Sequence, residues 1–221
     1  MRTTVIGHGH PPEDEEPSPE DVEEWQRSHE QPDNEVPVPL AVTAVLGRTD
    51  SLAVVLRSVE ACTTGFGFEV SVRLRQSPAP HDDVYGPVMG QAGAGDQLLL
   101  GVELADGRRT STLDGLGGWP PRAGAQGAEQ PVSLSSSGGG GGGRRVDRQW
   151  WVSPLPPDGP LRLVVRWDAR GLEETVTELD GTAVAAAGRR AEVLWPWEPE
   201  RFDAYEPEAP VRPGSGWFSR P

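Results

Sequence analysis

Nucleophilic catalysis by this chain would rest on one Cys/His pair. Cys62 is the only cysteine, and His81 is the candidate base. A nucleophilic cysteine needs a base within hydrogen-bond reach and a third group that orients the base. Cys62 ends an apolar run with the pattern of a buried strand, where a lone cysteine is usually a small core residue. His81 lies in a loop rich in Pro and Asp. We therefore expect no catalytic residue and do not predict an enzyme.

Two groups of residues carry side chains that bind metals. His8 and His10 precede the acidic run that starts at Glu13, and Asp82 and Asp83 are adjacent in a loop. A specific metal site needs ligands that are held in a fixed geometry, and the first group lies in a segment with little to bury. The acids lack the spacing of a calcium loop, and a single cysteine excludes a disulfide and a multi-cysteine zinc site. We expect no metal and no cofactor.

Six consecutive glycines, Gly138–Gly143, precede Arg144 and Arg145. A Gly-rich loop can present backbone N–H groups to a phosphate, which arginine can clamp. The P-loop pattern needs a lysine, and this chain has none, since all 20 of its Lys+Arg residues are arginine. Unpatterned glycine pre-organises nothing, so we favour a flexible connection between two strands.

Aromatic residues are the strongest candidates for binding a partner. Trp150 and Trp151 are neighbours in a strand-like segment, and neighbours on a strand point to opposite faces. We therefore expect one of them to face outward or onto another element. An outward tryptophan flanked by Arg148 and Arg166 would form an arginine-rimmed patch of the kind enriched in interfaces. In the alternative interpretation, the segment around Trp195 covers it.

The C-terminal segment is rich in Pro and Glu but also carries aromatics, which are unusual in purely solvating disorder. Trp217 and Phe218 follow a short Gly-Ser-Gly arm, and such an anchor can dock into a partner or fold back on its own domain. The predicted partner-binding residues are Trp150, Trp151, Arg148, Arg166, Trp217 and Phe218.

Charge is concentrated at the N-terminus. The formal net charge is -14, and residues 1–35 supply -9 of it, from eleven acids against Arg2 and Arg27. Nucleic-acid binding is disfavoured, because it needs clustered positive charge. The first residues lack the apolar core of a signal peptide, and no apolar run is long enough to span a bilayer, so we expect a cytoplasmic protein without membrane insertion.

Short β-type runs with turn signals between them fill the middle of the chain. One run alternates cleanly, with Phe66, Phe68, Val70 and Val72 on one face, and Asp-Gly at 106–107 marks a hairpin. The Ala-rich segment 182–195 has the spacing of a helix. The predicted fold is an all-β, immunoglobulin-like antiparallel β-sandwich over residues 36–197 with one C-terminal helix. Residues 1–35 are predicted to be a disordered acidic tail and residues 198–221 a disordered aromatic and Pro-rich tail.

Three segments also resemble a known group: TTGFGFEVSVRLR, LLLGVELADGRR and GGGGGGRRVDRQWWVSPLPPDGPLRLVVRW. Together they resemble uncharacterised β-sandwich proteins of high-GC actinobacteria, over roughly residues 40–197. The resemblance implies the fold and a source with a GC-rich genome, which the lack of lysine also favours. It implies no activity and no site residue.

Three hypotheses about function follow. In the preferred one, the protein is a non-catalytic binding or adaptor module. In the second, it is an enzyme or a small-molecule-binding protein that uses the long loops 76–96 and 114–145, with a polar lining of His81, Asp83, Tyr85, Arg144 and Asp147. In the third, it is a structural component of a larger bacterial assembly, joined through exposed edge strands. The sequence leaves the oligomeric state open.

Overall fold

A computed structural model describes residues 18–79, 82–91, 96–114 and 131–199 of the chain. The elements, in chain order, are α1 (Pro19–His29), β1 (Glu35–Val36), β2 (Val38–Leu40), β3 (Ala44–Arg48), β4 (Leu52–Ala61), β5 (Phe66–Leu74), α2 (Tyr85–Met89), β6 (Leu99–Glu103), β7 (Arg109–Ser111), β8 (Ser133–Gly142), β9 (Arg145–Ser153), β10 (Pro160–Trp167), the 3₁₀ turn η1 (Asp168–Arg170), β11 (Leu172–Asp180), α3 (Gly181–Gly188) and β12 (Glu192–Val193).

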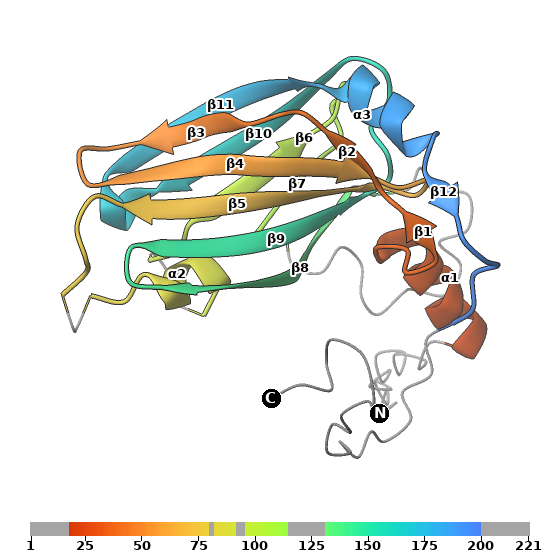
Figure 1. Ribbon diagram of the computed structural model, residues 1–221, viewed down its shortest axis with the longest axis horizontal. Helices are drawn as coiled ribbons and strands as arrows, with labels where there is room; N and C mark the ends of the chain where they lie inside the picture. The colour runs from red at the N-terminus through yellow and green to blue at the C-terminus, as the bar shows by residue number, and fades with distance from the viewer. Residues whose placement is uncertain (1–17, 80–81, 92–95, 115–130, 200–221) are drawn as a thin grey trace, which may run out of the picture.

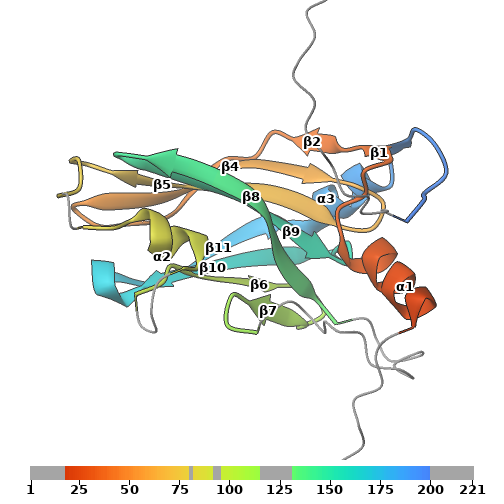
Figure 2. The same cartoon turned by 90° about the horizontal axis from the view of Figure 1, so that it is seen from below.

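The strands form two large antiparallel sheets and a small ribbon. The six-stranded sheet has the order β2-β4-β5-β9-β8, with β3 also paired to β4, and the four-stranded sheet has the order β11-β10-β6-β7. Strands β1 and β12 pair with each other. The two large sheets lie one above the other, and α1, α3, β1 and β12 gather at one end of them (Figures 1 and 2). The prediction of a mostly antiparallel β protein is confirmed.

One hydrophobic core fills the space between the two large sheets. On β5, the alternating residues Phe66, Phe68, Val70 and Val72 are all buried in it, as the sequence predicts. The facing strand β10 buries every second residue in the same way, ending at Trp167. Each fully buried side chain of this size contributes about 1.5–3 kcal/mol, so this interior holds the two sheets together.

The Asp-Gly hairpin is also confirmed. Gly107 has φ +87°, a conformation that favours glycine, and the backbone N–H of Leu104 donates to the carbonyl of Arg108 over 2.8 Å. The Asp106 carboxylate accepts a hydrogen bond from the backbone N–H of Arg108, and the Arg108 side chain lowers the pKa of Asp106. The hairpin joins β6 to β7.

The glycine run is a strand rather than a flexible connection. Residues 138–142 form the second half of β8 and pair with β9 along its length, and the turn is confined to Gly143 and Arg144. Glycine is needed at Gly139, because an added Cβ would lie 2.7 Å from the carbonyl oxygen of Asp147 and 3.0 Å from Cε of Met89 on α2. Close packing of α2 on this strand therefore explains part of the run.

The helix expected over 182–195 differs in extent. Helix α3 covers only Gly181–Gly188, and the Asp180 carboxylate caps it by accepting from the backbone N–H of Ala183 over 3.0 Å. The chain then turns, and Glu192–Val193 pairs with β1. The alanine-rich part has high helix propensity. The apolar residues after it instead find backbone partners in a second strand, which helical periodicity does not reveal.

The segment predicted as an N-terminal tail is partly structured. Helix α1 and the start of β1 fall within residues 1–35, and α1 contacts β9. The rings of Trp25 and His29 stack with centroids 5.1 Å apart, and the Arg27 guanidinium lies 6.0 Å from the ring centre of Trp197. Such tertiary contacts stabilise a short helix that would be marginal alone. Residues 1–17 and 200–221, which make up most of the two predicted tails, lie outside the described residues.

Candidate functional site

Both tryptophans of the predicted partner-binding patch are buried. Trp150 is 6% exposed and Trp151 is 1% exposed. Trp150 points into the core between the sheets. Trp151 points to the other face of the same sheet, as strand alternation requires, where the 63–65 turn covers it: an added Cβ on Gly65 would lie 2.6 Å from Cζ2 of Trp151. Of the two alternatives, an outward patch and a tryptophan covered by another element, the structure shows the second, although the cover is the 63–65 turn rather than the segment around Trp195.

The two predicted rim arginines lie on different sheets. Arg148 is half-buried on β9, with its guanidinium carbon 4.0 Å from the ring centre of Trp150 and Nη1 donating to the carbonyl of Val88 over 2.7 Å. Burial lowers the pKa of Arg148. Arg166 is exposed on β10 and pairs with Asp168 over 2.8 Å. Arg148 therefore packs α2 against the sheet, and the two arginines do not border one patch.

The other predicted contact residues, Trp217 and Phe218, lie outside the described residues. His81, which belongs both to the predicted Cys62–His81 pair and to the predicted loop lining, also lies outside the described residues. Cys62 is fully buried. Burial, followed by the nearby carboxylates of Glu35 and Glu60, raises the pKa of the Cys62 thiol to about 12. A thiol in this state is not a nucleophile near neutral pH.

The remaining residues of the loop hypothesis are used structurally. The Asp83 carboxylate accepts hydrogen bonds from the backbone N–H groups of Tyr85 and Gly86 at the start of α2. Arg144 and Asp147 lie at the β8–β9 turn, where Asp147 pairs with Arg145 over 2.6 Å. Desolvation raises the pKa of Asp147, but its hydrogen bonds and the nearby arginines outweigh it and leave the pKa lowered. Much of the second loop is strand β8, and no described pocket is lined by these residues.

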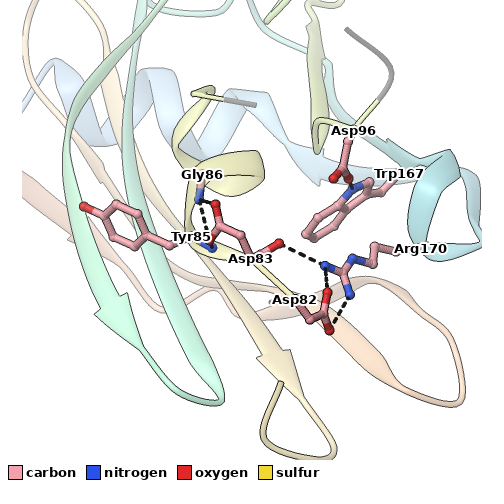
Figure 3. A network of polar contacts seen from close by, with 7 residues as sticks. All are labelled: Asp82, Asp83, Tyr85, Gly86, Asp96, Trp167 and Arg170. Carbon is pink, nitrogen blue, oxygen red and sulfur yellow. Dashed lines mark hydrogen bonds and ion pairs between the residues drawn. The ribbon is translucent and has the colours of Figure 1, made fainter. Parts of the chain in front are cut away.

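A polar network attaches the segment before α2 to the four-stranded sheet (Figure 3). The Arg170 guanidinium donates to both carboxylate oxygens of Asp82, over 3.1 and 2.6 Å, and to the carbonyl of Asp83. The Trp167 indole N–H donates to Asp96 over 3.1 Å, and the Arg170 guanidinium carbon lies 5.5 Å from the Trp167 ring centre. Hydrogen bonding to Asp82 raises the pKa of Arg170.

This network holds a loop and has no chemistry of its own. The carboxylates accept hydrogen bonds from an arginine, an indole or backbone groups, which leaves them as anchors rather than as a base. Among the described residues, no group of three or more His, Cys, Asp or Glu side chains is placed to hold a metal ion. The sequence signal for this anchor was the Asp82–Asp83 pair, but its arginine partner is 88 residues away along the chain.

A concave site lies at the end of the molecule where α1 meets the β1–β12 ribbon. Its pocket has a volume of about 560 Å³ and is lined by α1, by residues 30–35, by the 63–64 turn, by Val193 and by residues 196–198. The pocket is built by long-range contacts. The side-chain amide of Asn34 donates to the carbonyl of Trp195 over 2.8 Å, and the backbone N–H of Leu194 donates to the carbonyl of Asn34.

Polar contacts also fix the opposite wall of this pocket. The Glu35 carboxylate accepts hydrogen bonds from the backbone N–H of Thr63, over 2.7 Å, and from the Thr63 hydroxyl. The neighbouring Thr64 hydroxyl is buried and has no hydrogen-bond partner among the described residues. Glu35 therefore ties this wall to the 63–64 turn, and the Thr64 hydroxyl is buried within it rather than open to the pocket.

The charge of the pocket is negative. Four carboxylates line it, those of Glu30, Asp33, Glu35 and Glu198, against the single guanidinium of Arg27. Neither Asp33 nor Glu198 makes an ion pair within the part of the chain that the structure describes. An acid-lined pocket of this kind favours a cationic ligand group.

Four large apolar side chains are exposed in and beside the same ribbon. Val36 is 45% exposed, Val193 55%, Leu194 46% and Trp195 55%. Val36 lies opposite Glu192 on the ribbon, whereas Val193 lies opposite Glu35 and lines the pocket. We use the name ribbon face for the end of the molecule that carries these four residues and the acid-lined pocket. Val36 and Val193 point to opposite sides of the ribbon, and of the four only Val193 lines the pocket. Trp195, which the sequence offers as a possible cover for Trp150 or Trp151, is itself exposed. The run Val193-Leu194-Trp195 after an Ala-rich helix was the signal.

No family model, no curated protein and no solved structure matches this chain. The resemblance to actinobacterial β-sandwich proteins therefore stays a prediction. Within the described residues, none of the helices has the length and apolar character that crossing a membrane requires.

Proposed function

We propose that this protein is a non-catalytic binding or adaptor module that holds a partner protein on its ribbon face. The observation that carries this proposal is the coincidence of four exposed apolar side chains with an acid-lined pocket at one end of the molecule. Apolar area that stays exposed beside a concave polar site is typical of a surface that a partner covers. The polar clusters described elsewhere are internally satisfied.

The partner's chemistry follows from the residues of the ribbon face. The exposed Trp195 and its neighbours favour an apolar contact, and tryptophan is among the residues that dominate binding energy at interfaces. The pocket favours a basic side chain, because Asp33 and Glu198 can accept hydrogen bonds from a guanidinium or an ammonium group. We therefore expect a partner segment that combines apolar residues with arginine or lysine.

The proposal also includes the detailed fold class, the source and the cellular location predicted from the sequence. The two stacked sheets with one shared core support an immunoglobulin-like β-sandwich. The absence of lysine supports an actinobacterial source with a GC-rich genome. A single, buried thiol is consistent with a reducing cytoplasm, and the net charge of -14 argues against a nucleic-acid partner.

The proposal is tested with a phage-displayed library of random peptides panned against the full-length protein. We expect the selected peptides to combine Arg or Lys with large apolar residues. Their affinity, measured by isothermal titration calorimetry, should fall at least about tenfold for Trp195→Ala and for the pair Asp33→Asn with Glu198→Gln. Val176→Ala is the matched control, since Val176 is 57% exposed but lies on β11, in the four-stranded sheet.

Three outcomes would overturn the proposal. The first is that the library yields no binder. The second is that the selected peptides are acidic. The third is that they bind the Trp195 and Asp33/Glu198 variants as tightly as the wild-type protein. Equal loss for the Val176 control would show that the substitutions act through stability rather than through the ribbon face.

A further inference from the structure

Strand β8 is an edge of the six-stranded sheet. It pairs with β9 on one side, and among the described residues no backbone hydrogen bond joins 133–142 to any other segment. Helix α2 contacts this strand, with Met89 close to Gly139. The ten residues span roughly 33 Å at the usual rise of a strand. Within the described ranges, the outer backbone donors and acceptors of this strand are thus without a strand partner.

This edge carries neither of the two commonest blocks to pairing, charge and proline, although an irregularity between Ser136 and Gly138 interrupts its register with β9. Natural edge strands carry charges or prolines that block addition of another strand. Between Ser133 and Gly143 there is neither a charged residue nor a proline. The glycines do not crowd the edge either, because a Cβ at Gly140 or Gly142 would meet no atom within 4 Å. This uncharged stretch without proline is the first observation that points to a strand partner.

The second observation is a separation of charge along the strands of this sheet. At the β8–β9 turn lie Arg73, Arg75 and Arg144, all exposed and without an ion pair in the described part of the chain. The strand register places Arg73 opposite Arg145, and the backbone N–H of Leu74 bonds to the carbonyl of Arg144, so these guanidinium groups share one end.

The other end of the sheet is acidic. Helix α1 contacts β9 and lies at the end of the sheet opposite the β8–β9 turn (Figures 1 and 2). It exposes Glu20, Glu23 and Glu24 against the single cation Arg27 on the same helix. The sheet therefore has a basic end and an acidic end, separated by the length of β8.

We propose that β8 pairs antiparallel with β8 of a second copy of this chain, which joins the two six-stranded sheets into one continuous sheet across a two-fold axis. In such a pair, the basic turn of each copy lies beside the acidic α1 end of the other. The two-fold axis makes the two contacts identical, and each is attractive because it joins opposite charges. A parallel pair would place basic turn against basic turn. The charge separation thus favours the antiparallel arrangement of two copies.

This inference is independent of the proposed function. Neither Glu20 nor Glu23 lines the pocket of the ribbon face, and neither do the arginines of the β8–β9 turn. Failure of peptide binding and failure of self-association are therefore distinguishable.

The experiment is a charge swap read by sedimentation velocity and light scattering on the full-length protein, whose subunit mass is 23.7 kDa. The basic-end variant is Arg75→Glu with Arg144→Glu, and the acidic-end variant is Glu20→Arg with Glu23→Arg. The control, Arg189→Glu with Arg190→Glu, makes the same charge change after α3, a helix that contacts β2 and β4 near the opposite edge of the sheet.

We expect the wild-type protein and the control to be dimers of twice the subunit mass. Each swap variant alone should dissociate at least about tenfold more readily, because like charges then face each other at both ends. A mixture of the two swap variants should form a heterodimer, in which both contacts are again between opposite charges. Amide hydrogen exchange should show protection of residues 133–142 that increases with protein concentration in the wild type.

Several results would overturn the inference. A wild-type protein that stays monomeric as its concentration is raised would do so, and so would a dimer that both swap variants form as well as the wild type does. A dimer in which residues 133–142 exchange at a rate independent of concentration would place the interface elsewhere. Peptides that protect β8 in a monomer would assign the edge to a foreign strand instead of a second copy.

Discussion

Two adjacent glycines of β8 should respond oppositely to the same substitution. Gly139→Ala places a Cβ 2.7 Å from the carbonyl oxygen of Asp147, a distance that real Cβ atoms essentially never show, and 3.1 Å from Cα of Arg148. Because both atoms belong to the backbone of β9, the strand pair has to shift. Gly140→Ala meets nothing within 4 Å. Neither glycine has a positive φ, so alanine is compatible with the backbone conformation at both positions.

The magnitudes follow from two effects. Replacing glycine by alanine in a strand stabilises the fold by roughly 0.5–1 kcal/mol, because the unfolded chain loses conformational freedom. This effect is common to the two variants. Overpacking adds a cost of about 1–3 kcal/mol at Gly139 only. We therefore expect Gly140→Ala to raise the free energy of unfolding slightly and Gly139→Ala to lower it, with a difference of about 1–3 kcal/mol between them.

Urea unfolding followed by tryptophan fluorescence measures both variants, since Trp150, Trp151 and Trp167 are buried in the fold. The protein concentration has to be fixed, because association shifts the apparent stability. In a thermal melt, the difference corresponds to about 2–4 °C per kcal/mol for a chain of this size. Equal stability of the two alanine variants, or a more stable Gly139→Ala, would refute the packing of α2 and β9 against this strand.

Three further predictions concern buried and paired groups. The Cys62 thiol, whose pKa is raised to about 12, should not react with a thiol reagent at about pH 8 until the protein unfolds. The free energy of unfolding should also fall as the pH rises from 9.0, the ordinary thiol pKa, towards about 12. Burial lowers the pKa of His29 below 6.5, so the neutral imidazole stabilises the docking of α1 fully above pH 6.5, and this stabilisation is lost as the pH falls below that value. Hydrogen exchange of residues 19–29 would detect the loss, and His29→Gln should abolish its pH dependence. Arg170→Met should lower the free energy of unfolding by about 1–2 kcal/mol and expose residues 82–91 to exchange, because it removes a bidentate pair. Arg166→Met, which breaks a solvent-exposed pair with Asp168, should change it by less than about 0.5 kcal/mol.

Local patterns predicted the strands well and the contacts between elements poorly. The alternation in β5 and the Asp-Gly turn depend on neighbouring residues, so the sequence shows them directly. Local propensity does not predict the strand at Gly138–Gly142, because glycine is disfavoured in strands. This strand forms because β9 and Met89 of α2 lie against it. Tertiary pairing thus overrode the local preference for a flexible loop.

The exposed-patch alternative for Trp150 and Trp151 did not hold for a related reason. Strand alternation correctly required Trp150 and Trp151 to face opposite ways, but alternation says nothing about what covers each face. The cover on Trp151 comes from the 63–65 turn, which is more than eighty residues earlier in the chain. The same distance in sequence hid the ribbon face, since Asn34 and Trp195 are 161 residues apart. Surfaces of this protein are decided by such long-range contacts.

The two proposed surfaces lie in different parts of the molecule, because the ribbon face includes the separate β1–β12 ribbon and β8 is an edge of the six-stranded sheet. The ribbon face stands at the α1 end, next to the pairing of β1 and β12, while the proposed joint runs along β8. A two-fold axis through β8 would place the two ribbon faces at opposite ends of the continuous sheet. A partner with two basic, apolar segments could then contact both, and its apparent affinity would exceed that of one segment when its linker spans the distance. If dimerisation and peptide binding are both observed, the Arg75→Glu with Arg144→Glu monomer, whose substitutions lie at the opposite end from α1, should bind single peptides normally but lose this gain for a tandem peptide.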